Sequence, residues 1–561
     1  MKSTIKIYCR NTSSYIDVQG GETLLEVASR LFGDSGFTPV CAIVNNRSED
    51  LGFPIFMPKQ VEYLDAASAV GRRTVIRSLC MMLYRALYDI LPDCNLRIEH
   101  SISRGYYCRL VDPDTQEAMP VDTDTIERLR VRMQELVAAD LPFERKERLT
   151  EDVLKRFRRQ RLTAKVLLLE TTRRLYTTYY TLDGIADSFY GPLVPNTGLL
   201  KVFDLLPWKE GMLLLPPDSA DPTMPAVPVV QEKMYRAFTE HLKFNRIIRV
   251  SNVGELNRAV RERQTSQLIN VAEAMHDKLL GKISDQILER RRQGGGRIVL
   301  IAGPSSSGKT TTTKRLGIQL MTNLMTPKMI SLDDYFIDRH LTPRDANGDY
   351  DFEHLHALDL ERLNSDLQRL LDGEEINLPT YSFEFGRRID KDRPLRLESD
   401  EVLLIEGIHG LNPELVSGLD QADVFKVYVS ALTTLRIDNH NWISTTDNRL
   451  LRRVVRDHRY RHISALETLR RWPSVRRGEE RWIFPFQENA DATFNSSLIF
   501  ELGVMRSYAE PLLHDVPQND PQYAEAFRLL RLLGYFENIP VDQIPTTSLL
   551  REFLGGSSFH Y

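Results

Sequence analysis

Hydrophobic and polar residues alternate in two short segments near the N-terminus, 5–8 (Ile-Lys-Ile-Tyr) and 14–18 (Ser-Tyr-Ile-Asp-Val). A period of two predicts β-strands, and the polar residues 11–13 between them predict a turn. Over residues 22–32 the apolar spacing changes to that of a helix, and 41–44 (Cys-Ala-Ile-Val) predicts another strand. We therefore expect a small β-rich unit with one helix at the start of the chain.

Helical spacing returns over residues 250–292 and ends in three glycines at 294–296, which predict a helix stop or a hinge. Residues 297–302 (Arg-Ile-Val-Leu-Ile-Ala) then read as a buried strand, and 311–325 as a helix. Two more apolar runs, 329–332 and 402–407, predict further strands. This alternation of strand and helix favours an α/β unit with a parallel sheet.

Size and composition are those of an ordinary multidomain globular protein. The 561 residues correspond to about three to four domains. A formal net charge of −4 gives no overall attraction to nucleic acid or to an anionic membrane. The sequence shows no apolar run near the ~18 residues that span a bilayer. Its five scattered cysteines form no C-x-x-C pair, which argues for reduced thiols. We expect a cytoplasmic protein without membrane segments.

Residues 303–310 (Gly-Pro-Ser-Ser-Ser-Gly-Lys-Thr) match the phosphate-binding pattern G-x-x-x-x-G-K-[ST], between a predicted strand and a predicted helix. In that setting backbone N–H groups surround a phosphate chain, the lysine reaches the terminal phosphates, and the final hydroxyl holds Mg²⁺. A glycine turn without a ligand is the weaker alternative. The residues expected to bind ATP are Gly303, Ser305, Ser306, Ser307, Gly308, Lys309, Thr310 and Thr311.

Two acidic residues stand at the ends of predicted strands downstream of this loop, Asp333 and Glu406. The carboxyl ends of parallel strands meet at the ligand-binding edge of an open α/β sheet. A kinase acting on an alcohol needs a carboxylate near the acceptor hydroxyl, and Asp333 is the better candidate. The alternative for Asp333 is a solvated turn. Thr310, Glu406 and Asp333 are the expected metal ligands.

Six sequence blocks occur in a recognisable order. They are 303–311, 331–336 (Ser-Leu-Asp-Asp-Tyr-Phe), 351–359 (Asp-Phe-Glu-His-Leu-His-Ala-Leu-Asp), 378–383 (Leu-Pro-Thr-Tyr-Ser-Phe), 404–408 (Leu-Ile-Glu-Gly-Ile) and 449–457 (Arg-Leu-Leu-Arg-Arg-Val-Val-Arg-Asp). With them the chain from 297 to about 513 resembles the uridine/cytidine kinase branch of the phosphoribulokinase–uridine kinase family. The resemblance implies transfer of the γ-phosphoryl group of ATP, with Mg²⁺, to the 5′-hydroxyl of a ribonucleoside.

The resemblance also implies roles for individual residues. Asp333 matches the catalytic aspartate, Glu353 the carboxylate that holds the ribose hydroxyls, and Glu406 the Mg²⁺-associated glutamate. Arginines at 452–461 match the helix and lid that hold the transferring phosphate; an exposed basic helix is their alternative. The implied catalytic residues are Asp333, Lys309, Arg456 and Arg461. The implied substrate-binding residues are Glu353, Tyr381, Phe383, Arg388 and Arg453.

Two departures from that family's pattern bear on the acceptor. Gly386 stands where the family has a base-reading histidine, so the identity of the base is not inherited. Residues 433–448, which include Trp442, read as an insertion. A sugar, a pantothenate-like compound or another alcohol is therefore an alternative acceptor.

The N-terminal segments carry a second resemblance. The predicted strand pair, Gly-Gly-Glu-Thr-Leu-Leu-Glu-Val-Ala at 20–28 and the stretch at 40–46 resemble the ubiquitin-like TGS domain of threonyl-tRNA synthetases. Segments 77–108 and 189–198 resemble the synthetase editing domain. All four editing residues are replaced, by Arg77, Met81, Phe189 and Leu193, so hydrolysis of aminoacyl-tRNA there is not expected. This domain could still bind RNA, a small molecule or a partner protein. It could equally serve as a scaffold or a dimerisation module.

Together these patterns predict a multidomain α/β and α+β chain. The expected parts are a TGS-like domain (1–65), an editing-like domain (66–248), a helical linker (249–296), a P-loop nucleoside kinase with a parallel sheet flanked by helices (297–513) and a helical tail (514–561). The expected partners are ATP, a nucleoside-like acceptor and, through a homo-oligomer, other copies of the chain. An RNA-associated protein in which ATP acts as a switch is the alternative from a different functional class.

Overall fold

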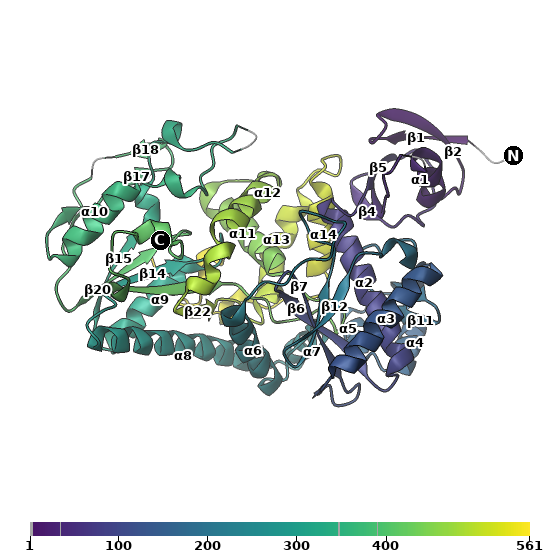
Figure 1. Ribbon diagram of the computed structural model, residues 1–561, viewed down its shortest axis with the longest axis horizontal. Coiled ribbons are helices and arrows are strands. Elements are labelled where there is room, and N and C mark those ends of the chain that lie inside the picture. The colour runs from purple at the N-terminus through teal and green to yellow at the C-terminus, as the bar shows by residue number, and fades with distance from the viewer. Residues whose placement is uncertain (1–3, 34, 346–347, 390, 561) are drawn as a thin grey trace.

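A computed structural model describes residues 4–33, 35–345, 348–389 and 391–560, and Figure 1 shows an elongated molecule with the N-terminal strands at one end. The first sheet has the order β2-β1-β5-β3-β4. Its strands are β1 (Thr4–Cys9), β2 (Ser14–Gln19), β3 (Cys41–Val44), β4 (Arg47–Glu49) and β5 (Gln60–Leu64). Helix α1 (Leu24–Phe32) begins two residues later than predicted, because Thr23 and Glu26 cap it reciprocally.

The next part of the chain has two sheets, with the orders β12-β13-β7-β6 and β11-β10-β9. Its strands are β6 (Asn95–Ile102), β7 (Gly105–Val111), β8 (Ala118–Met119), β9 (Glu144–Leu149), β10 (Tyr176–Leu182), β11 (Ile185–Asp187), β12 (Asp204–Trp208) and β13 (Gly211–Leu215). Its helices are α2 (Ala69–Ile90), α3 (Thr123–Ala139), α4 (Thr150–Arg159), α5 (Thr163–Thr172) and α6 (Glu232–Ile247).

The helical stretch predicted over 250–292 is two helices, α7 (Val253–Arg261) and α8 (Thr265–Arg292). The predicted helical character is therefore present, with a break at 262–264, where Arg263 takes a left-handed backbone angle of φ +60°. Helix α8 ends before the glycine run, as predicted, and lies along α9 beneath the C-terminal sheet (Figure 1).

The C-terminal sheet is parallel and has the order β15-β20-β14-β21-β22. Its strands are β14 (Ile298–Ala302), β15 (Thr326–Ser331), β20 (Glu401–Glu406), β21 (Val424–Ser430) and β22 (Ala492–Asn495). Two two-stranded antiparallel sheets lie beside it: β16 (Ile376–Asn377) with β19 (Pro394–Leu395), and β17 (Tyr381–Ser382) with β18 (Arg387–Arg388). The accompanying helices are α9 (Lys309–Thr322), α10 (Leu360–Leu371), α11 (Thr445–Arg461), α12 (Ala465–Trp482), α13 (Glu501–His514), α14 (Tyr523–Leu533) and α15 (Arg551–Leu554).

The mixed α/β architecture predicted from the sequence is confirmed. Its largest hydrophobic core is built by elements from several parts of the chain. One hydrophobic cluster contains residues of α7 and α8, of the C-terminal sheet, and of α11 and α13 to α15. Leu529, Leu532 and Phe553 of the predicted tail are each fully buried or nearly so. The predicted linker and tail therefore pack against the sheet, while the domain boundaries themselves stay predictions. Among the described helices, none is long and apolar enough to span a membrane.

Residues 431–444, here called the joining segment, connect β21 with α11 and contact the N-terminal half of the chain. Lys165 of α5 lies 2.7 Å from Asp187 and 2.9 Å from Asp438, measured from its Nζ to a carboxylate oxygen of each. His440 Nδ1 lies 2.6 Å from the other oxygen of Asp187. These four side chains are at most 2% exposed. Most of the stretch read as an insertion thus forms a buried contact, and its last four residues begin α11.

Candidate active site

The phosphate-binding loop follows β14 and leads directly into α9, as the sequence pattern predicts. Gly308 adopts φ +85° and a Cβ there would lie 2.7 Å from Leu549 Cδ2, so the position requires glycine. A Cβ on Gly303 would collide with the carbonyl oxygen of Val429. Ser306 also adopts a left-handed angle, φ +58°. The backbone therefore has the shape that such loops need to surround a phosphate chain.

Arginines of α11 form hydrogen bonds with this loop. Arg449 Nε donates to the carbonyl oxygen of Ser305 at 2.9 Å, and Arg453 Nη1 donates to the Ser305 hydroxyl at 2.7 Å. Arg452 is fully buried, ion-paired with Glu501 at 2.6 Å, and reaches the carbonyl oxygens of 306 and 307 at 3.4 Å. The alternative of an exposed basic helix is therefore wrong for Arg452, which is buried under the loop together with Arg449.

The residues expected at the metal come together at the carboxyl end of the parallel sheet. The Thr310 hydroxyl donates a hydrogen bond to Glu406 Oε1 at 2.8 Å. β20, which ends in Glu406, lies between β14 and β15, and Asp333 follows β15. A hydroxyl and two carboxylates are oxygen donors of the kind that Mg²⁺ prefers. The donor set therefore fits the expected ion.

Several charged side chains lie close together at this site, and burial shifts the pKa values of three of them. Burial raises the pKa of Asp333, against the lowering effect of the Lys309 and Arg461 charges. Solvent reaches the Asp333 side chain, but the atoms packed around it remove much of its hydration. Burial also lowers the pKa of Lys309 and raises the pKa of Glu406 to about 7. Perturbed groups gathered at one place mark a candidate functional site.

Glu406→Gln is expected to stabilise the fold above neutral pH by about 1–2 kcal/mol. The folded-state pKa of Glu406, about 7, lies above the ordinary glutamate pKa of 4.5. Its contribution to stability is therefore complete below pH 4.5 and is lost as the pH rises through 7. Urea unfolding at pH 8 and pH 4.5 should show the gain only at pH 8. Glu398→Gln, an exposed residue before the same strand, is the control. Equal gains at both pH values would contradict the assignment.

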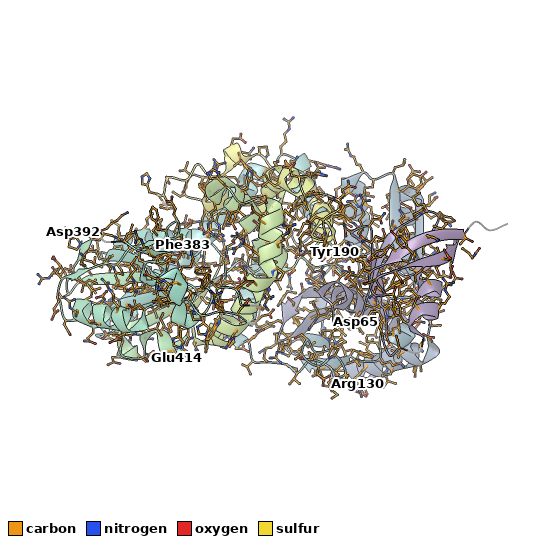
Figure 2. All side chains as sticks on the ribbon, turned by 90° about the horizontal axis from the view of Figure 1, so that it is seen from above. Asp65, Arg130, Tyr190, Phe383, Asp392 and Glu414 are labelled. Atoms are coloured by element: carbon orange, nitrogen blue, oxygen red, sulfur yellow. The ribbon has the colours of Figure 1, made fainter. Side chains whose placement is uncertain are left out.

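The residues expected to bind the acceptor form a second group beside Asp333. Burial and, after it, the Glu479 carboxylate raise the pKa of Glu353 to about 7, against the lowering effect of the Arg453 and Lys309 charges. The ring of Tyr381 lies 5.1 Å from Phe383 and 5.5 Å from Phe336. Tyr381 is buried and Phe383 is 54% exposed. Phe383 lies at the end of the molecule away from the N-terminal sheet (Figure 2).

Arg388, which was expected to bind substrate, and Gly386, which departs from the family pattern, both lie in close contact with other parts of the protein. Arg388 forms an ion pair with Asp359 at 2.9 Å and donates to the carbonyl oxygen of Phe336, so its guanidinium is already engaged. Gly386 adopts φ +65°, and a Cβ there would lie 2.7 Å from Arg339 Cζ. The place of the family's base-reading histidine is therefore occupied by the Arg339 guanidinium.

The remaining predicted arginines gather around one carboxylate. Asp457 forms ion pairs with Arg453 at 3.2 Å, with Arg456 at 2.7 Å and with Arg461 at 3.5 Å. Arg461 and Arg456 also lie close enough to Asp333 to lower its pKa. The structure thus brings the predicted lid arginines to the same edge of the sheet as the carboxylates.

Two acidic residues at the loop were missed by the sequence analysis. Glu479 of α12 accepts a hydrogen bond from the Ser305 backbone N–H at 3.1 Å and pairs with Arg449. Glu552 of α15 accepts hydrogen bonds from the Thr311 N–H at 3.1 Å and from the Thr311 hydroxyl at 2.6 Å. No local motif marks either position, because each is more than 160 residues from the loop.

Comparison with known proteins agrees with both halves of the sequence interpretation at a coarse level. Residues 298–498 match the model of the Phosphoribulokinase / Uridine kinase family. The N-terminal part is similar to the threonine–tRNA ligase of Desulforamulus reducens, 28% identical over 187 residues. That of Rubrobacter xylanophilus is 26% identical over 190 residues. These alignments cover 33% and 34% of this chain and 29% of each ligase, so the chain spans under a third of these relatives.

Solved structures with partial likeness include two kinases. A possible uridine kinase from Bacillus stearothermophilus is 20% identical, with a TM-score of 0.25, over 38% of this chain and 99% of that one. The D-glycerate 3-kinase from Cryptococcus neoformans var. grubii is 14% identical, with a TM-score of 0.20, over 45% and 87%. The family-level prediction for the C-terminal region is thus confirmed by the family model, whereas the uridine/cytidine branch stays a prediction.

Proposed function

We propose that this protein transfers the γ-phosphoryl group of ATP to the 5′-hydroxyl of a ribonucleoside. One observation carries the proposal. Six charged side chains from separate parts of the sequence meet at the carboxyl edge of one parallel sheet. They are Lys309, Asp333, Glu353, Glu406, Arg456 and Arg461. A loop for phosphates, oxygen donors for a metal and a carboxylate for the acceptor are the parts that phosphoryl transfer requires.

On the donor side, the backbone N–H groups of the loop and Lys309 would hold the β- and γ-phosphates. Thr310 and Glu406 would hold Mg²⁺, which when bound supplies positive charge to the phosphate oxygens. Arg456 and Arg461 would neutralise charge that develops on the transferred group. Their side chains already lie near Asp333.

On the acceptor side, Asp333 would orient the hydroxyl and take its proton. Glu353 would accept hydrogen bonds from the ribose hydroxyls, and Tyr381 and Phe383 would pack against the nucleoside. Where the family has its base-reading histidine, the Arg339 guanidinium lies against Gly386. A guanidinium offers only hydrogen-bond donors, whereas an imidazole can also accept. This replacement is the observation that favours the second candidate, a kinase for a different small alcohol.

For the rest of the chain we propose the TGS-like and editing-like assignments, with their predicted boundaries. The likeness to threonine–tRNA ligases supports them. Arg77 supports loss of the editing chemistry, because it is buried and donates to the carbonyl oxygen of Pro192 at 3.0 and 3.1 Å. We propose a binding role for this part rather than hydrolysis.

Glu552→Gln is expected to tighten ATP binding by roughly threefold to tenfold. The carboxylate of Glu552 occupies the N–H and hydroxyl of Thr311, at the positive end of α9 where a nucleotide phosphate would bind. Removing its charge removes a competitor for that position. Calorimetric titration with ATP and Mg²⁺ measures the change, and Asp542→Asn, an exposed residue of the same tail, is the control. Weaker binding in Glu552→Gln would show that Glu552 supports the nucleotide instead.

A coupled assay of ADP release over a panel of ribonucleosides, sugars and other alcohols tests the proposed acceptor. The proposal expects the highest kcat/KM with a ribonucleoside and little ADP release without acceptor. Turnover only with a sugar or a non-nucleoside alcohol would contradict the nucleoside assignment and keep the kinase. ATP hydrolysis that no acceptor accelerates would contradict both.

A further inference from the structure

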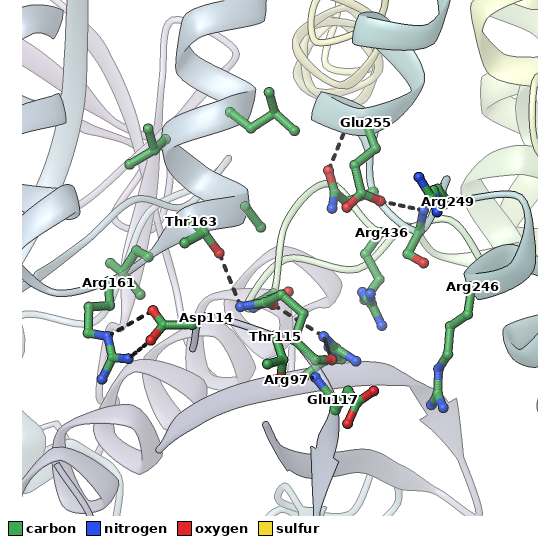
Figure 3. A pocket seen from close by; sticks show the side chains of 18 of the residues that line it. Arg97, Asp114, Thr115, Glu117, Arg161, Thr163, Arg246, Arg249, Glu255 and Arg436 are labelled. Carbon is green, nitrogen blue, oxygen red and sulfur yellow. Dashed lines mark hydrogen bonds and ion pairs between the residues drawn. The ribbon is translucent and has the colours of Figure 1, made fainter. Parts of the chain in front are cut away.

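A large cavity, lined by none of the residues of the phosphate-binding loop, lies between the N-terminal half and the joining segment (Figure 3). Its volume is about 960 Å³. Its walls come from β6 and β7, residues 114–118, the end of α4, most of α5, the end of α6, α7 and the joining segment. Eight arginines line it, against four carboxylates. This local excess of positive charge contrasts with the formal net charge of −4 for the whole chain.

Two of these arginines are buried and incompletely partnered. Arg97 of β6 is 5% exposed and Arg436 of the joining segment is 3% exposed. Arg97 donates to the carbonyl oxygen of Gln116 at 2.7 Å, and Arg436 pairs with Glu99, yet both Nε atoms lack a hydrogen-bond partner. Burial, together with the charge of Arg436, lowers the pKa of Arg97 to about 9. Glu99 supplies one negative charge to these two buried guanidinium groups, and the two open Nε atoms with the remaining positive charge favour a further anion.

Further positive charge surrounds these two residues. The guanidinium groups of four further lining arginines form no hydrogen bond or ion pair with another described residue: Arg109, Arg246, Arg249 and Arg258. Arg246 and Arg249 are exposed, and Figure 3 shows Arg246 on the same side of the cavity as Arg436. Glu117 and Glu255 limit the excess but do not cancel it. The arrangement suits a ligand with more than one negative charge.

We propose that this cavity binds a small molecule carrying two or more phosphate groups. The planar fork of arginine binds phosphate oxygens through two parallel hydrogen bonds. The volume of the cavity lies within the roughly 300–1,000 Å³ of small-molecule sites. Its lining, over the described residues, contains no aromatic side chain. Single-stranded RNA is commonly bound by stacking on such side chains, so a small phosphorylated ligand fits better than RNA.

Calorimetric titration of the full chain with pyrophosphate and with ADP tests the proposal. The experiment uses the Lys309→Ala background, which weakens binding at the phosphate-binding loop. In this background we expect one polyphosphate bound per chain, in the cavity. Arg246→Glu with Arg249→Glu, both exposed, should weaken its binding at least tenfold, about the loss of one charge-assisted hydrogen bond. Tighter binding of ADP would identify a nucleotide, and equal binding a ligand recognised by its phosphates alone.

The matched control reverses two charges on the exposed surface of α6 outside the cavity, Arg236→Glu with Lys243→Glu. It should bind pyrophosphate as the parent does. The proposal is overturned if the parent binds neither probe, if both double variants weaken binding equally, or if only a short RNA binds. Because the parent carries Lys309→Ala, these outcomes do not depend on the proposed kinase activity.

Discussion

Asp333→Asn is expected to lower kcat by at least about a hundredfold while ATP binding stays nearly intact. Asparagine keeps the size and hydrogen-bonding reach of the side chain but cannot take a proton from the acceptor. Asp333 lies near Lys309, Arg456 and Arg461, where the γ-phosphoryl group and acceptor would meet. Steady-state kinetics with the best acceptor and calorimetry with ATP measure the two effects separately.

Asp334→Asn is the matched control, because it changes the neighbouring carboxylate in the same way. Asp334 forms an ion pair with Arg393 at 3.0 Å and has no place in the proposed reaction. Its loss should change kcat much less than loss of Asp333. Wild-type turnover in Asp333→Asn would remove Asp333 from the role of base and leave the acceptor half of the site without one.

Lys165→Met is expected to lower the free energy of unfolding by about 3–5 kcal/mol, the second large effect. Burial alone would lower the pKa of Lys165, but Asp187 and Asp438 raise it above its usual value. Without the ammonium group, the buried carboxylates of Asp187 and Asp438 would lose the cation that pairs with both, and only hydrogen bonds with residues such as His440 would remain. Because the pairs join α5 to the joining segment, the contact between the two halves should weaken first.

Urea unfolding followed by circular dichroism measures this loss of stability. Comparing the dependence of the unfolding free energy on urea concentration between variant and wild type detects any loss of cooperative unfolding. Lys155→Met is the control, since Lys155 is 66% exposed and pairs with Asp152 on the surface of α4. Such surface pairs contribute about 0–1 kcal/mol. Equal stability of Lys165→Met and the wild type would show that the buried network does not connect the halves energetically.

The phosphate-binding loop and its partners could be predicted because their positions follow from local rules. A strand followed by a glycine-rich loop and a helix fixes residues 303–310, and parallel strands place Asp333 and Glu406 at one edge. The hydrogen bond from Thr310 to Glu406 agrees with that expectation. Sequence spacing was informative here because the loop follows the buried strand β14, Glu406 ends the buried strand β20, and Asp333 follows β15 closely.

Other parts of the site could not be predicted, because their partners are distant in sequence. Glu552 reaches Thr311 only through the packing of the C-terminal helices, and Arg339 fills the space at Gly386 only through the fold of two loops. Arg452 resembled a lid arginine, but the structure buries it with Glu501 under the loop. Periodicity and motifs describe neighbours along the chain, whereas these contacts depend on tertiary packing.

The most direct test of the central claim is whether the γ-phosphoryl group of ATP reaches the 5′-oxygen of a ribonucleoside. The wild-type chain is incubated with γ-labelled ATP, Mg²⁺ and the best nucleoside of the panel, and the product is identified by mass spectrometry and phosphorus NMR. The account predicts a labelled nucleoside 5′-monophosphate, formed at least a hundredfold more slowly by Asp333→Asn. Label found only in inorganic phosphate, at the same rate in both proteins, would contradict it.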